Sequence, residues 1–108
     1  MNRDVLTTNQ EIEIETKRLD DLHGQEVPLG EKMAAAQREF ERAVGRLAID
    51  SEITGLRGVE AEKVLRAKAA DLKYEWTLAE VVYKSNIRAQ ENSRTKLTGL
   101  YGKRKHIE

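Results

Sequence analysis

The sequence has no cysteine, one proline and few aromatic residues, which occupy 5% of its 108 positions. Without cysteine the chain can form neither disulfides nor thiolate metal sites. A single proline and few runs of β-branched residues disfavour a β-sheet. Charged residues make up 35% of the chain, so little bulk is left for a globular interior. What is plentiful is Ala, Glu, Lys, Leu and Arg, the composition of long helices and coiled coils.

The sequence also lacks long apolar runs and the motifs of common enzymes. No stretch approaches the roughly 20 apolar residues that cross a bilayer, and the first ten residues hold no apolar signal-peptide core. Hydrolase, zinc-protease and nucleotide-binding motifs are missing. His23 and His106 fall beside predicted helix ends, where histidine interacts with the helix dipole and solvent. We therefore expect a cytoplasmic, non-enzymatic protein without cofactor, metal or small-molecule substrate.

The clearest pattern is a heptad series in the second half of the chain. From Leu65, core-type positions recur at alternating spacings of four and three residues, as in a coiled coil. The segment from Val59 to Leu97 holds neither glycine nor proline, so it predicts one long helix. The series comprises Leu65, Ala69, Leu72, Trp76, Ala79, Tyr83, Asn86, Gln90, Ser93, Leu97 and Leu100. It divides near Tyr83, since it is apolar before that residue and polar after it.

The positions of glycine and proline predict an all-α, three-helix antiparallel bundle in one domain. We expect a short helix over about 8–23, a long one over about 29–53 and the longest over about 59–98. Gly24 and Pro28 indicate a loop over 25–30, and the glycines of Thr54–Gly58 indicate a hairpin turn. Val64, Leu78, Val81 and Val82 lie outside the heptad series and widen the apolar face for the first helix. Residues 99–108 are expected to form a basic tail after Gly99 and Gly102 end the helix.

A short strand is the competing prediction for residues 8–16. Ile12 and Ile14 alternate with glutamates there, as they would in a half-buried strand. Helix is preferred because the following residues keep a helical period and no second strand is available for pairing.

The net charge of zero conceals an asymmetry. Residues 1–52 carry a net charge of −5 and residues 53–108 carry +5. Such a division indicates head-to-tail association, an intramolecular charge match or a basic segment for nucleic acid. The polar part of the series is expected to be solvated or held by a polar partner. The candidate partner-binding residues are Lys84, Asn86, Arg88, Gln90, Arg94, Lys96, Tyr101, Lys103, Arg104 and Lys105.

The segment Glu75–Lys84 (EWTLAEVVYK), followed by Arg88, resembles a segment found in small helical proteins encoded by bacteriophages. In that group an Ala-rich acidic hairpin precedes such a segment, and the members look like accessory proteins near recombination or early functions. The resemblance implies a phage-encoded, non-enzymatic protein in the host cytoplasm. It supplies no catalytic residue.

Three functions follow as hypotheses. The first is an interaction protein that associates with itself or docks on a protein through the long third helix. The second is a nucleic-acid-binding accessory factor in phage recombination or replication that uses the basic C-terminal segment. The third is an inhibitor of a host defence enzyme, in which the acidic first half imitates nucleic acid.

Overall fold

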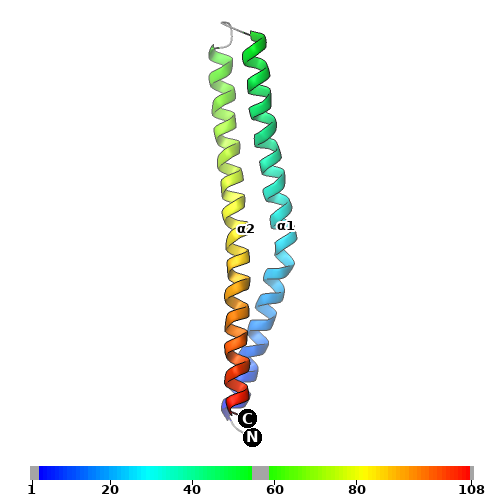
Figure 1. The fold of residues 1–108 in the computed structure, drawn as a ribbon, viewed down its shortest axis with the longest axis vertical. Helices are drawn as coiled ribbons and strands as arrows, with labels where there is room; N and C mark the ends of the chain where they lie inside the picture. Colours follow the sequence, from blue (N-terminus) through cyan, green and yellow to red (C-terminus); the bar gives the residue numbers. More distant parts are fainter. Residues whose placement is uncertain (1–2, 55–58, 108) are drawn as a thin grey trace. The chain divides into compact units, whose positions relative to one another are not determined.

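The computed structural model of the chain describes residues 3–54 and 59–107, with the side chains of residues 48, 50–54 and 59–62 left undescribed. It consists of two long helices, α1 (Arg3–Thr54) and α2 (Val59–Ile107) (Figure 1). The described residues contain no strand, so the all-α prediction is confirmed and the alternative strand over 8–16 is wrong. Of the predicted turn, residues 55–58 lie outside the described part of the chain.

The chain divides into two compact units. Unit 1 combines Met1–Val27 with Lys84–Glu108, and unit 2 is Pro28–Tyr83. Within each unit a segment of α1 lies antiparallel beside a segment of α2, as in a helical hairpin (Figure 1). The boundary on α2 falls between Tyr83 and Lys84, where the heptad series changes from apolar to polar.

The loop expected over residues 25–30 is wrong, because α1 continues through it. No separate third helix is present in the described residues, since the helices predicted over 8–23 and 29–53 are parts of α1. Gly24 and Pro28 are both exposed, so a helix can pass through them without loss of packing. A proline inside a helix costs about 3 kcal/mol, which the packing on either side must offset.

An unbroken heptad series on α1 explains its continuity. Positions spaced by three and four residues are buried or half-buried from one end of the helix to the other. The series comprises Val5, Thr8, Ile12, Glu15, Leu19, Leu22, Glu26, Leu29, Met33, Ala36, Phe40, Ala43 and Leu47. The 4–3 spacing runs through Gly24 and Pro28 without a shift in phase, so the same face of α1 serves both units.

The helix expected to stop near residue 98 also continues, as α2 reaches Ile107. Its last turns are held by packing within unit 1. Leu97 and Leu100 are buried in a cluster with Ile12, and Arg104 Nη1 donates to Asn9 Oδ1 at 3.3 Å. Gly99 and Gly102 therefore lie inside the helix, and the flexible basic tail predicted over 99–108 is helical through Ile107.

Unit 2 is held together by apolar and aromatic contacts between the two helices. The rings of Phe40 and Trp76 are 5.5 Å apart, with Lys73 Nζ above both. Trp76 and Tyr83 have structural roles, because each packs against α1. Gly30 leaves room for Tyr83, whose Cε2 would lie 3.3 Å from a Cβ built at that glycine.

Candidate interaction surfaces

The interior of unit 1 is built from polar side chains as well as apolar ones. Thr8, Glu15, Asn86, Gln90 and Ser93 are all buried between the two helices, with exposures of 6% or less. Buried polar groups are costly unless they are hydrogen-bonded. All but Thr8 form hydrogen bonds that reach the opposite helix, either directly or through a neighbouring side chain.

Both carboxylate oxygens of the buried Glu15 have a partner on α2. Its Oε1 accepts a hydrogen bond from Ser93 Oγ at 2.8 Å, and its Oε2 lies 3.3 Å from Lys96 Nζ. The Ser93 hydrogen bond is the main reason that the pKa of Glu15 is lowered; burial opposes it, and Lys96 and Arg18 lower the pKa further. Glu15 is therefore a buried carboxylate that is stabilised in its charged form.

A chain of hydrogen bonds occupies the neighbouring part of this interior. Arg94 Nη2 donates to Gln90 Oε1 at 3.2 Å, and Gln90 Nε2 donates to Asn86 Oδ1 at 2.6 Å. Asn86 Nδ2 then donates to the backbone oxygen of Leu22 at 2.9 Å. The expectation that the polar part of the α2 series is solvated or held by another protein is wrong, because α1 of the same chain covers it. Asn86 and Gln90 are thus buried inside the single chain.

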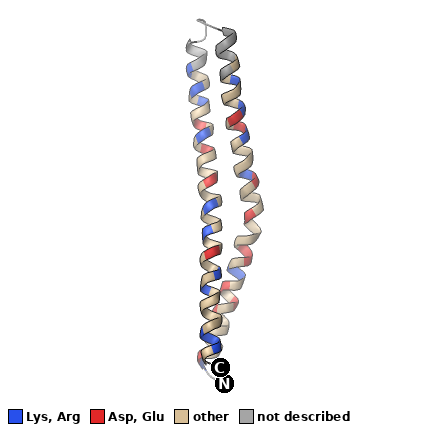
Figure 2. Cartoon of the chain, viewed as in Figure 1, with Lys and Arg blue, Asp and Glu red and all other residues tan. Residues whose placement is uncertain are grey.

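The basic candidates all lie on α2 within unit 1, and most of them are exposed (Figure 2). Lys96 pairs with Glu15 yet keeps 61% of its side chain exposed. Arg104 is half-buried, with its guanidinium carbon 5.1 Å from the centre of the Tyr101 ring. The other basic candidates are exposed: Lys84, Arg88, Arg94, Lys103 and Lys105. The structure thus keeps the charged heads accessible while α2 holds them at fixed spacing.

The charge asymmetry is matched inside unit 1. Its α1 part, residues 3–27, has three basic and seven acidic side chains, whereas its α2 part, residues 84–107, has seven basic and one acidic. Of the three predicted explanations, the intramolecular match is therefore present. Attraction between the two segments favours the antiparallel pairing that the polar series requires.

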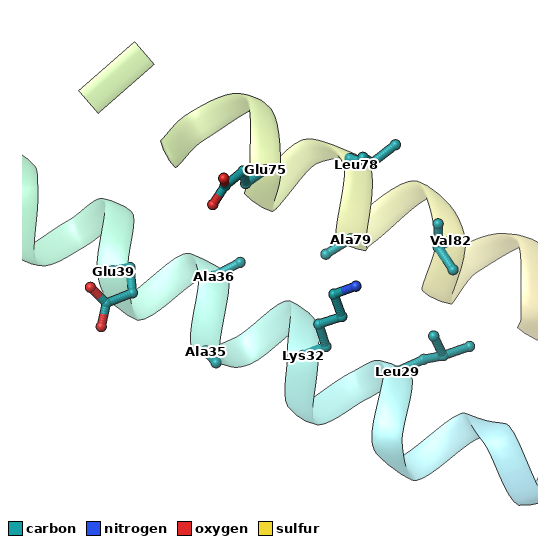
Figure 3. Close-up of a pocket in the computed structure, with 9 residues that line it drawn as sticks. All are labelled: Leu29, Lys32, Ala35, Ala36, Glu39, Glu75, Leu78, Ala79 and Val82. Atoms are coloured by element: carbon teal, nitrogen blue, oxygen red, sulfur yellow. The ribbon is translucent and has the colours of Figure 1, made fainter. Parts of the chain in front are cut away.

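Unit 2 carries a different surface, an apolar groove of about 600 Å³ between the two helices. Its floor includes Ala36 and Ala79, and Figure 3 shows the side chains that flank it. Leu78 and Val82 border the groove and are 51% and 44% exposed. The other lining residues are Leu29, Lys32, Ala35, Glu39 and Glu75. We refer to these nine residues as the unit 2 groove.

More exposed apolar side chains continue from the groove along the outside of α2. Tyr74 and Val81 are 68% and 55% exposed, and each lies about one helical turn from Leu78 of the groove. The sequence contained this signal, since Leu78, Val81 and Val82 stand outside the heptad series. The predicted packing of these side chains on the first helix is not seen, since they stay 44% to 55% exposed in the described structure.

The described residues contain no group of three or more His, Asp or Glu side chains that could hold a metal ion. No helix in the described part of the chain is long and apolar enough to cross a membrane. Comparison with protein-family models, curated proteins and solved structures finds no match. The function has to be argued from the two surfaces themselves, and the phage source stays a prediction.

Proposed function

We propose that this chain is a non-enzymatic helical interaction protein that binds a protein through α2. The observation that carries the proposal is the exposed apolar surface formed by the unit 2 groove together with Tyr74 and Val81. Contiguous apolar surface on a small, highly charged protein is typical of a protein-binding site. A groove between two helices accepts a third helix by packing of side chains, and this needs no catalytic group.

The proposal moves the working surface along α2 from the position expected from sequence. The candidates from Lys84 onward include two buried side chains, Asn86 and Gln90, that the chain already uses internally. The exposed apolar residues precede Lys84 and belong to unit 2. Basic side chains such as Arg88 remain available to bind a protein that also contacts unit 1.

Photo-cross-linking in cells that express the chain tests this function. A photoactivatable residue replaces Val82, which borders the groove, and in a matched control it replaces Thr77, which is exposed on another face of α2. We expect covalent adducts with a protein from position 82 and few from position 77. Equal labelling from the two positions, or none from position 82, would contradict the proposal.

Nucleic-acid binding is a second candidate function, and it is favoured because the basic end of α2 is helical as far as Ile107. At 100° per residue, five of the candidate partner-binding residues fall on about two fifths of the helix circumference: Lys84, Arg88, Arg94, Tyr101 and Lys105. Tyr101 is 45% exposed there, so basic and aromatic groups share one accessible face, as in single-strand binding sites. The face also contains Glu91, which weakens its positive potential.

Fluorescence anisotropy with labelled single-stranded DNA and RNA tests this second candidate. Binding should weaken steeply as salt rises, and Tyr101→Ala with Lys105→Gln should reduce it by about tenfold or more. Lys63→Gln with Lys68→Gln, both exposed in unit 2, is the matched control and should leave it unchanged. An affinity that does not change with salt concentration, or that falls equally in both variants, would count against this function.

A further inference from the structure

Unit 2 covers its own interior less well than unit 1 does. Its heptad positions Met33, Phe40, Leu72 and Trp76 are only half-buried, although they face the opposite helix. In unit 1 most of the heptad positions are buried, among them Ile12 and Leu97, whereas in the described part of unit 2 the buried ones are the small residues Ala69 and Ala79. Two helices of this width need further helices beside them to exclude water, as in a four-helix bundle.

The charged groups of the unit 2 groove are separated by sign along its length. Glu39 on α1 and Glu75 on α2 lie at one end, and Lys32 lies nearer the middle, with its side chain extended toward α2 (Figure 3). Ala35 and Ala36 stand midway on α1, three to four residues from both Lys32 and Glu39. Lys32 and Glu39 are therefore each about 5 Å along the helix from this midpoint.

This spacing makes the groove complementary to itself. A twofold axis through Ala35 and Ala36, perpendicular to the helices, places Lys32 of one copy at the level of Glu39 and Glu75 of the other. The same rotation brings the small alanines of the two copies together, where helices can approach closely. Leu78 and Val82 would then lie against the other copy instead of in water.

We propose that the occupant of the unit 2 groove is a second copy of this chain, bound antiparallel to form a four-helix bundle in this region. The inference rests on the proposed function, since it names the protein that the same surface binds. A nucleic acid would meet two carboxylates and apolar side chains in the groove. An unrelated helix would need the same spacing of one lysine and two glutamates, which a second copy of this chain already has.

Formation of a dimer is compatible with the charge of the whole chain. The net charge is zero, so two copies do not repel one another through their overall charge. Glu39 already pairs with Arg42 at 3.2 Å, but both side chains are more than half exposed. Exposed pairs of this kind contribute little to stability, so Glu39 can exchange Arg42 for Lys32 of the other copy.

Charge-reversal variants of the full chain test the arrangement by sedimentation equilibrium. Lys32→Glu alone makes the groove wholly acidic, and Glu39→Lys with Glu75→Lys makes it wholly basic. Each variant by itself should dimerise at least about tenfold more weakly than the wild-type chain, because like charges then meet at both ends. An equimolar mixture of the two should recover a dimer, since every pair across the axis is again of opposite sign.

Circular dichroism of each variant checks that the helices still form, and Lys63→Glu, exposed in unit 2 outside the groove, is the charge-matched control. A wild-type chain that stays monomeric to about 100 μM would overturn the inference. So would a dimer whose strength the groove variants do not change, or a mixture that fails to recover it. A monomer whose position 82 still cross-links to a different protein would refute the second copy and retain the proposed function.

Discussion

At the scale of single residues, unit 1 shows that heptad position determines burial here more than side-chain polarity does. Glu15 and Thr8 are buried because they fall on the α1 series, whereas Ile14 is 70% exposed because it does not. Glu15 was missed because its partners, Ser93 and Lys96, are 78 or more positions away in the chain.

Thr8 offers a test of the cost of an unpaired hydroxyl. Its side chain is fully buried, and its Oγ1 has no hydrogen-bond partner in the described structure. Thr8→Val keeps the shape and removes the unsatisfied group, so it should raise the free energy of unfolding by about 1 kcal/mol. Urea denaturation followed by circular dichroism measures the change, with Thr98→Val as an exposed control. A loss of stability in Thr8→Val would show that the hydroxyl is paired.

Glu15 predicts a dependence of stability on pH. Because the Ser93 hydrogen bond and Lys96 lower its pKa in the folded chain, the charged carboxylate stabilises the fold above the unfolded value of about 4.5. This contribution is lost as the pH falls through the lowered pKa. The wild-type chain should exceed Glu15→Gln in unfolding free energy at pH 7, and the difference should shrink steadily below about pH 4.5.

Ser93→Ala separates the cause of this pH dependence from a general effect of acid. Removal of the hydroxyl hydrogen bond should move the pKa of Glu15 back upward, so the loss of stability would begin at a higher pH. Urea denaturation over a pH series measures both variants. A difference between wild type and Glu15→Gln that stays constant from pH 7 to pH 3 would refute the buried ionic pair.

At the scale of elements, the helices were predictable and their ends were not. Each residue assigned to the α2 heptad series from Leu65 to Leu100 is buried or half-buried, and the change of character at Tyr83 coincides with the boundary between units. The ends failed because Gly24, Pro28, Gly99 and Gly102 were read as stop signals. Local propensity of this kind is overridden where the residues on either side pack against another helix.

The continuity of α1 makes a prediction for Pro28. Its side chain is exposed, so Pro28→Ala removes no core packing and restores a helical backbone donor for the carbonyl of Gly24. The substitution should raise the free energy of unfolding by about 2 kcal/mol, the cost of an internal proline less its restriction of the unfolded chain. Thermal unfolding followed by circular dichroism measures it. An unchanged or lowered stability would favour the loop over 25–30 that the sequence pattern had indicated.

At the scale of the whole molecule, the two units differ in which side chains they bury and which they leave exposed. Unit 1 pairs its buried polar side chains internally, apart from the hydroxyl of Thr8, and its acidic part of α1 lies against its basic part of α2. Unit 2 leaves apolar residues such as Leu78 exposed beside a groove of about 600 Å³. Sequence patterns identified these apolar residues but assigned them to pack on the helix predicted over 8–23. The assignment failed because the patterns did not show that α1 continues through residues 25–30.

The absence of cysteine allows a direct measurement of the groove-to-groove contact. Ala35 lies beside the proposed twofold axis and is exposed in the single chain, so a cysteine there would meet its own copy in the dimer. Cysteines form a disulfide only when their Cα atoms come within about 7 Å. Under mild oxidation, Ala35→Cys should form a covalent dimer rapidly, and the exposed control Thr77→Cys should not. Equal, slow cross-linking of both variants, or none of Ala35→Cys, would contradict the second copy in the unit 2 groove.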